Sequence, residues 1–246
     1  MSKTQKDKDP QAKPNQDKVK SNTQLLETTA TSTPKGLDTE KFIRKNRLLL
    51  GGALGILLLV VLSILYYRYT MQAAEAQAQE EMFPAVSFIE SDSVKLAYEG
   101  NDAFPGFKEI QADYAGTKAA NLAAFYAGVA LMKQEKFKEA LTQLEKFNSR
   151  DLLLQARAYA LVGDCYSEMA QYAKAEEYYK KASEYKPNDQ FTPRYLIKLA
   201  LVLENQNKYP EAIQVYDKLI EKHFKANNEL TEAKKYKARL EQLRQK

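Results

Sequence analysis

The sequence has few of the residues from which catalytic and metal sites are commonly built. Its 246 residues include one cysteine, one histidine and no tryptophan. Cys165 has no partner for a disulfide within the chain, and we expect a small buried hydrophobe, with an intermolecular disulfide as the alternative. His223 has no second histidine or cysteine near it, which excludes the usual zinc sites and histidine-based triads. A glycine-rich phosphate loop is also missing, so we predict no cofactor, no catalytic residue and no enzymatic activity.

Most of the chain also has no excess of positive or negative charge. The net charge is +5, but residues 1–47 hold 11 Lys and Arg against 6 Asp and Glu, a surplus that accounts for all of it. The other 26 basic and 26 acidic residues cancel in number. We therefore expect no broad basic surface after residue 47, and we predict that the protein does not bind nucleic acid.

The longest stretch without charge is residues 48–67, LLLGGALGILLLVVLSILYY. At about 1.5 Å per residue, a helix of this length reaches about 30 Å, which is the hydrocarbon thickness of a bilayer. A buried core helix seldom runs this far without a polar face, so we predict a single transmembrane helix here. Gly51 and Gly55 have the spacing of a helix-packing motif, or are simply tolerated at these positions.

The flanks of this stretch predict its orientation. Four basic residues lie in the segment 41–47, whereas Arg68 is the only one between the stretch and Glu75. Because cytoplasmic flanks are enriched in Lys and Arg, we expect a cytoplasmic N-terminus and an exported C-terminal domain. Ala74 and Ala76 have the spacing of a signal-peptidase site, but the leader and the apolar run are longer than in a usual signal peptide. We therefore predict a retained, single-pass anchor.

The segments around the anchor differ in composition. Residues 1–47 are rich in Lys, Asp, Gln, Ser, Thr and Pro, and they predict a disordered basic cytoplasmic tail. Residues 68–84 are mostly strong helix formers and predict a helical stalk. Pro84 then marks a break or the first turn of the next helix. Further helices are expected over residues 85–98 and 107–114.

From Asn121 onward the sequence repeats itself. The clearest copy contains Tyr159 and Gly163, followed by Ala175 and Tyr179. This is the pattern of a tetratricopeptide repeat, with Tyr in place of Trp and Phe. The small residues let two antiparallel helices approach closely, while the tyrosines fill the space between the helical turns.

Two further copies flank the clearest one. Gly128 and Ala140 occupy the small positions of the preceding copy, and Ala200 and Ala212 those of the following copy. The matching alanines are 35 and 37 residues apart. These spacings are close to the expected period of about 34 residues, with the excess in the turns between repeats.

The rest of the exported part completes the array. Residues 85–116 form a degenerate copy, and residues 230–243 have the amphipathic pattern of a capping helix. We therefore predict an all-α fold, in which a single N-terminal transmembrane helix is followed by a tetratricopeptide-repeat α-solenoid over residues 85–246.

Several short segments resemble a known family. They are Asp92-Ser93, residues 98–101 (YEGN), residues 105–107 (PGF) and residues 114–123 (YAGTKAANLA). Together with the basic tail and the single span, they are similar to the YfgM-like family, especially its Bacteroidota-type members. Members of this family are ancillary subunits of the SecYEG translocon with a periplasmic tetratricopeptide domain. The resemblance implies a bacterial inner-membrane protein beside the translocon and a membrane-anchored periplasmic chaperone, and it implies no catalytic residue.

Two non-catalytic functions fit these observations. The first is a periplasmic protein-protein interaction scaffold that assists the handling of exported proteins, with translocon subunits, a periplasmic chaperone or emerging polypeptides as partners. The alternative is a tetratricopeptide organiser of cell division or of another envelope assembly. Fold analogy does not separate the two.

We expect the partner to bind the concave face, which the first helix of each repeat lines in such a solenoid. The predicted residues are Leu122, Phe125, Val129, Met132, Arg157, Asp164, Glu168, Arg194, Ile197, Leu201 and Glu204. Phe125 and Val129 stand where a carboxylate clamp needs Lys and Asn, so an apolar surface for a partner helix or unfolded segment is predicted rather than a site for an acidic chain end. The alternative is that Phe125, Val129 and Met132 pack against the preceding repeat and are buried.

Overall fold

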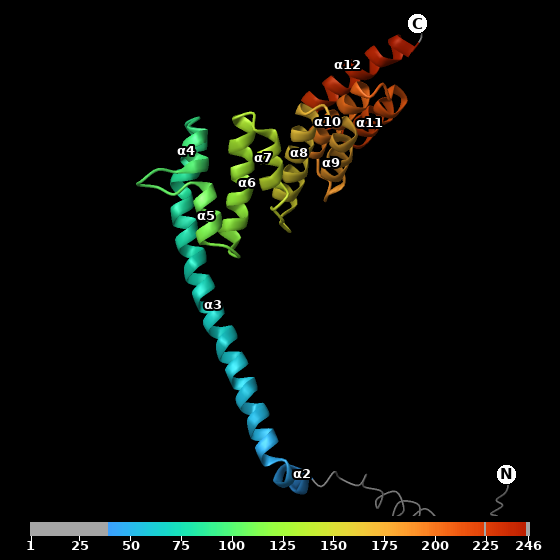
Figure 1. The fold of residues 1–246 in the computed structure, drawn as a ribbon. Helices are drawn as coiled ribbons and strands as arrows, with labels where there is room; N and C mark the ends of the chain where they lie inside the picture. Colours follow the sequence, from blue (N-terminus) through green and yellow to red (C-terminus); the bar gives the residue numbers. More distant parts are fainter. Residues whose placement is uncertain (1–38, 224, 245–246) are drawn as a thin grey trace, which may run out of the picture. The chain divides into compact units, whose positions relative to one another are not determined.

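The computed structural model describes residues 39–223 and 225–244, so the disorder predicted for residues 1–38 lies outside the described part of the chain. This described part is all-α, and Figure 1 shows the order of its helices. The chain divides into two compact units, Met1–Ile64 and Leu65–Lys246. The helices are α2 (Thr39–Lys45), α3 (Arg47–Glu90), α4 (Val94–Glu99), α5 (Phe107–Asp113), α6 (Lys118–Lys133), α7 (Phe137–Leu144), α8 (Leu152–Glu168), α9 (Tyr172–Glu184), α10 (Thr192–Asn205), α11 (Tyr209–Lys222) and α12 (Asn227–Arg244).

The first unit contains α2 and the amino-terminal part of α3. Thr39–Lys45 is helical, so the predicted disordered tail is wrong over this segment. The helix ends on Arg44 and Lys45, and basic residues stabilise the negative end of a helix dipole. The side chains of residues 48–64 are exposed, and α3 is the one helix among the described residues that is long and apolar enough to cross a membrane.

The second unit is built from helix pairs in which small residues permit close contact. α6 and α7, α8 and α9, and α10 and α11 lie side by side, and we call these pairs repeats 2, 3 and 4 (Figure 1). A Cβ atom added at Gly163 would lie 2.7 Å from Cδ1 of Tyr179, and one at Gly128 would lie 2.5 Å from Cγ of Leu144. These crossings have no room for another side chain, which confirms the predicted role of the small residues.

The turn between the two helices of each repeat has one repeated conformation. Glu135, Ala170 and Asn207 each lie seven positions after the small residue of the first helix, and their φ angles are 59°, 55° and 59°. In each turn the next N–H donates to the carbonyl five residues earlier, as in the hydrogen bond of 2.8 Å from Gln171 to Tyr166. This is the Schellman arrangement, which closes a helix with one left-handed residue. Three non-glycine residues therefore share a backbone position that glycine prefers.

The same turn occurs a fourth time, at the end of α3. Asp92 has a φ of 60°, and the Ser93 N–H donates to the Phe88 carbonyl at 2.8 Å. Ala85 and Ala97 are fully buried, and they are twelve positions apart, as Gly163 and Ala175 are. The carboxyl-terminal part of α3 and α4 therefore form repeat 1, whose first helix begins before the predicted degenerate copy at residue 85.

The helix boundaries around Pro84 differ from those predicted. Pro84 lies inside α3, which continues through it to Glu90, so the predicted break is wrong. Its missing N–H leaves the Glu80 carbonyl without the usual helical hydrogen bond. The helix predicted over residues 85–98 is in fact two, because the left-handed turn at Asp92 separates α3 from α4.

The predicted stalk is not separate from the repeats. Ala78 and Met82 are buried, and Met82 packs in one cluster with Phe107 and Ile110 of α5. The Glu75 carboxylate accepts hydrogen bonds from the N–H groups of Lys118 at 2.6 Å and Ala119 at 3.1 Å, at the start of α6. A carboxylate there satisfies two unpaired donors and interacts with the positive end of the helix dipole. The predicted boundary between residues 84 and 85 is therefore wrong, because repeat 1 already includes Glu75.

One continuous core joins repeats 2, 3 and 4 to α12. It includes the fully buried side chains of Leu131, Leu196, Tyr216 and Leu219, together with Leu240 of α12. α12 packs against α10 and α11, and Figure 1 shows it at the end of the array. Its remaining surface is mostly polar, as expected of a helix that closes a stack of repeats.

Candidate protein-binding face

Ion pairs join the first helices of successive repeats. Asp164 of α8 pairs with Lys198 of α10, whose Nζ lies 2.5 Å from Oδ1 and 2.7 Å from Oδ2. α10 and α12 are joined in the same way by Arg194–Glu229, at 2.9 Å, and by Glu204–Arg239. The two members of each pair are 34 or 35 residues apart, which is the repeat period. We call the surface formed by these six residues the first-helix face.

The acidic and basic members of these pairs differ in exposure. The carboxylate side chains of Asp164, Glu229 and Glu204 are 20%, 17% and 12% exposed. Their partners Lys198, Arg194 and Arg239 are 41%, 68% and 50% exposed. The first-helix face therefore presents cationic groups to the solvent, and the carboxylates beneath them fix their positions.

Buried tyrosines from the second helices hold two of these carboxylates. The Tyr179 hydroxyl donates to Oδ1 of Asp164 at 2.6 Å, and the Tyr216 hydroxyl donates to Oε1 of Glu204 at 2.7 Å. Burial and the adjacent carboxylate raise the pKa of both tyrosines above the ordinary value, so both hydroxyls stay protonated as donors. Each carboxylate thus contacts its own repeat through a tyrosine and the next first helix through a cation.

A shallow groove lies beside these pairs, between α10 and α12. Its volume is about 300 Å³, and it is lined by Arg194, Ile197, Lys198, Asn228, Glu229 and Glu232. Three of the six lining residues belong to the ion pairs described above. Five of the six lining side chains carry polar or charged groups, but most of the accessible lining is apolar, because Ile197 and the aliphatic stems of the long side chains contribute to it.

The predicted apolar residues of α6 belong largely to the core. Phe125 is 2% exposed, and its ring centroid lies 5.2 Å from that of Phe147. Leu122, Val129 and Met132 are partly buried against the same core. Phe125 is therefore not available to a partner, and its burial comes partly from Phe147, after α7, rather than only from the preceding repeat.

The other predicted residues fall into three groups. Arg157 and Glu168 of α8 are exposed, and neither belongs to an ion pair of the first-helix face. Asp164, Arg194 and Glu204 form the ion pairs. Ile197, at 7% exposed, is buried in the core, and Leu201 is partly buried there. The structure places Asp164, Arg194 and Glu204 in separate ion pairs, each with a residue that was not predicted, and it buries most of Ile197, whose remaining surface lines the groove.

Lys198, Glu229 and Arg239 complete the ion pairs and were not among the predicted residues. A signal for them exists in the sequence, because opposite charges recur at the repeat period, 34 or 35 residues after Asp164, Arg194 and Glu204. Only a correct repeat register makes this recurrence visible, since the residues of each pair are far apart in the chain.

Neither Cys165 nor a cluster of acidic residues forms a metal site within the described part of the chain. Cys165 is fully buried, and burial raises the pKa of its thiol to about 12, so that it stays protonated at neutral pH. Within residues 39–223 and 225–244, no group of three or more His, Cys, Asp or Glu side chains is placed to hold a metal ion.

Comparison with known families decides what the helix pairs are. Two family models, both described as tetratricopeptide repeat, match residues 156–189 and 196–228. These helix pairs are tetratricopeptide repeats. The matches cover most of α8 and α10 and all of α9 and α11. Repeats 1 and 2 lie outside the matches but share the small residues and the left-handed turn of the matched tetratricopeptide repeats.

No curated protein matches the chain. The tetratricopeptide fold is nevertheless informative, because stacked repeats form extended surfaces that bind other proteins. The protein is therefore a tetratricopeptide-repeat protein suited to protein-protein interaction.

Proposed function

We propose that the protein is a membrane-anchored scaffold that binds partner proteins through its first-helix face. The observation that carries this proposal is the row of cations on α10 and α12, each more exposed than the partly buried carboxylate that pairs with it. An arginine has five N–H donors, and Arg194 uses only its Nε towards Glu229. The remaining donors are positioned before a partner arrives, which lowers the entropy lost on binding.

The membrane anchor is the apolar part of α3. Residues 48–64 expose leucine, isoleucine and valine side chains around the whole helix, and such a surface is stable in lipid rather than in water. The basic residues before it favour a cytoplasmic N-terminus, and thus a repeat array on the outer side of a bacterial inner membrane.

The resemblance to YfgM-like proteins supports a more specific partner. We propose that the array faces the periplasm beside the SecYEG translocon and contributes to the handling of exported proteins together with a periplasmic chaperone. Translocon subunits, the chaperone and emerging polypeptides are the partners that follow from this assignment.

In-cell crosslinking of the full chain tests both the face and the partner. A photoreactive residue at Arg194 or Arg239 is expected to capture a partner after mild-detergent purification, and the same residue at Lys180, exposed on α9, serves as the matched control. Recovery of translocon channel subunits from the first two positions supports the proposal. Recovery of only cell-wall or division proteins would assign the scaffold to another envelope assembly, and equal capture from Lys180 would refute a role for the first-helix face.

Topology needs a separate measurement. A reporter that is active only after export, fused to the C-terminus, is expected to be active, and one fused before residue 41 is expected to be silent. The opposite result would place the repeats in the cytoplasm and rule out the periplasmic assignment.

A further inference from the structure

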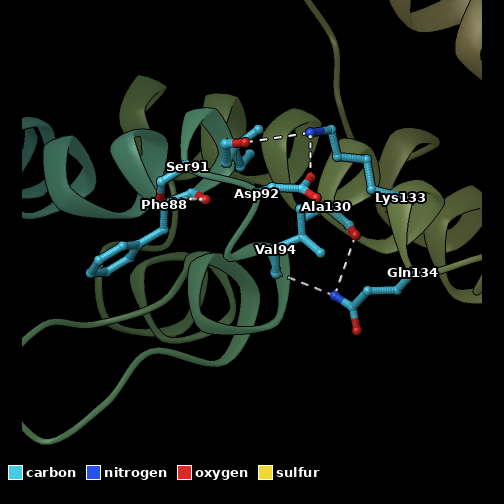
Figure 2. A network of polar contacts seen from close by, with 8 residues as sticks. Phe88, Ser91, Asp92, Val94, Ala130, Lys133 and Gln134 are labelled. Atoms are coloured by element: carbon cyan, nitrogen blue, oxygen red, sulfur yellow. Dashed lines mark hydrogen bonds and ion pairs between the residues drawn. The ribbon is translucent and has the colours of Figure 1, made fainter.

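In repeats 2, 3 and 4, the residue that follows the first helix is glutamine twice and methionine once. It lies six positions after the small residue, and it is Gln134, Met169 and Gln206 in repeats 2, 3 and 4. Figure 2 shows Gln134, whose Nε2 donates to the carbonyl of Val94, the first residue of α4, at 3.3 Å. Gln206 Nε2 donates in the same way to Tyr172, the first residue of α9, at 3.4 Å. We call this bond, from a first helix to the second helix of the preceding repeat, the cap bond.

Repeat 3 lacks the cap bond, because the thioether of Met169 has no N–H to donate. The residue equivalent to Val94 and Tyr172 is Phe137, the first residue of α7. Met169 and Phe137 line an open cavity of about 320 Å³. A cavity of about 440 Å³ lies at the equivalent residues of repeat 1, which include Asp92 and Val94, so the cavity does not distinguish the two junctions. What distinguishes the junction of repeats 2 and 3 is that it has no directional cap bond.

Ion pairs show the same contrast between junctions. Those that cross the other two junctions are Lys133–Asp92 at 3.1 Å, drawn in Figure 2, Lys198–Asp164 at 2.5 Å and Lys208–Glu176 at 2.7 Å. Among the described residues, the helices of repeats 2 and 3 are joined by one polar side-chain contact, from the Tyr166 hydroxyl to Glu145 at 3.4 Å. We call the junction of repeats 2 and 3 the second junction and that of repeats 3 and 4 the third junction. Of the junctions between repeats, the second therefore has the weakest polar connection.

The segment between α7 and α8 divides its hydrogen bonds between the two repeats. Asn148 exchanges two bonds with the Asn121 side chain of α6, at 2.9 and 3.1 Å. The next residue, Ser149, donates from its N–H to Gln155 of α8 at 2.6 Å, and its carbonyl accepts from Tyr185 of α9 at 3.3 Å. Asn148 therefore bonds to repeat 2, whereas the next residue, Ser149, bonds to repeat 3.

Apolar packing holds this junction together without fixing its angle. Phe125 and Phe147 of repeat 2 share one core cluster with Val162 of α8. Apolar contacts are non-directional, whereas hydrogen bonds depend steeply on distance and angle. We propose that the array has a hinge between Asn148 and Ser149, and that repeats 1 and 2 move against repeats 3 and 4. Such movement changes the angle between α6 and the first-helix face.

Distance distributions between spin labels on the full chain, in mild detergent, test this hinge. Thr142, Glu177 and Gln214 are exposed and lie fourteen positions after the small residue of repeats 2, 3 and 4. Thr142→Cys with Glu177→Cys spans the second junction, and Glu177→Cys with Gln214→Cys spans the third. Cys165 is buried and its thiol is protonated, so it is not labelled.

The wild-type distribution is expected to be broader across the second junction than across the third. Met169→Gln has almost the same volume as the wild type and supplies the missing donor. One added hydrogen bond of ordinary strength is expected to lower the population of the wide arrangement about fivefold. Gln206→Met is the matched control, and it is expected to broaden the distribution across the third junction.

Equal widths across the two junctions of the wild-type chain would overturn the hinge. If Met169→Gln fails to fold, the wild-type comparison and Gln206→Met still decide the question. A third junction that stays narrow in Gln206→Met would show that the cap bond does not set the junction angle, and would also refute the proposal.

Discussion

α6 and α8 share one repeat geometry but differ in their surfaces. Leu122 and Arg157 occupy the same position, six residues before the small residue, and Val129 and Asp164 lie one residue after it. In α6 both side chains pack against the core, whereas Arg157 is exposed and Asp164 pairs with the next repeat. Helix spacing therefore sets the direction of a side chain, and the neighbouring repeat decides whether that side chain is covered.

The largest expected effect comes from a substitution in α6, the apolar helix of this comparison. Phe125→Ser should lower the free energy of unfolding by about 3–5 kcal/mol, because it empties a core site and leaves a hydroxyl there. Phe125, Ala160 and Ile197 occupy the same repeat position and are 2%, 4% and 7% exposed, so the position belongs to the core in each repeat. Thermal or denaturant unfolding measures the loss.

Arg157→Ser is the matched control on α8, and its expected change is within about 0.5 kcal/mol, as for most exposed sites. A Phe125→Ser protein with unchanged melting but lost partner crosslinking would contradict the burial of Phe125. It would return this residue to the binding surface.

A second substitution compares the close crossings of repeats 2 and 3. Gly163→Ala should destabilise the protein by about 1–3 kcal/mol, because the added Cβ meets the Tyr179 ring. Tyr179 is held by its hydrogen bond to Asp164, whereas Leu144, which faces Gly128, has no polar contact to restrain its rotation. We therefore expect Gly128→Ala to cost less. Equal losses in denaturant unfolding would show that the tyrosine hydrogen bond does not stiffen repeat 3.

Alkaline pH is expected to destabilise repeats 3 and 4, which have a buried tyrosine at a position where repeat 2 has none. The position of Tyr179 and Tyr216 is occupied in repeat 2 by Leu144. The pKa of both tyrosines is raised in the folded state, so their contribution to stability is complete below the unfolded value of about 10. Above that pH the unfolded state loses protons that the folded state keeps, and stability should fall by about 1.4 kcal/mol per pH unit for each tyrosine.

Melting temperatures between pH 9 and pH 11 check this expectation. Tyr179→Phe and Tyr216→Phe should each make the decline shallower, whatever their effect at neutral pH. Tyr209→Phe is the control, since the Tyr209 side chain is exposed. An unchanged slope in the first two variants would mean that the hydroxyls ionise as readily in the folded chain as in the unfolded chain.

The smallest expected effect is a gain in the free energy of unfolding. Ala170 has a φ of 55°, so Ala170→Gly should raise the free energy of unfolding by about 0.5–1 kcal/mol through relief of the left-handed strain. Ala173→Gly, three residues later in the first turn of α9, should lower it by about 0.5–1 kcal/mol. Denaturant midpoints that move in the same direction for both variants would contradict the turn geometry.

Much of the repeat register could be predicted from Gly128, Gly163 and Ala200, because close helix crossings demand small residues at a fixed spacing. Repeat 1 could not be predicted in full, since Pro84 suggested a break and Ala85 and Ala97 are not distinctive as alanines. The burial of Phe125 was one of two alternatives that the sequence left open, and the sequence could not decide between them because the burial depends on Phe147, in a segment without helical periodicity. The ion pairs were in principle accessible, but only after the repeats had been aligned.

The contribution of Glu75 to α6 has a practical consequence for work with isolated parts of the protein. A soluble fragment that starts at residue 85 would lack the carboxylate that caps α6, together with Met82, which packs in one cluster with Phe107 and Ile110. Such a fragment would expose apolar surface that the full chain buries, and its self-association or binding would reflect the cut end. Fragments for interaction or crystallisation studies should therefore start before Met71, whose Cε lies 3.4 Å from where a Cβ atom on Gly116 would be.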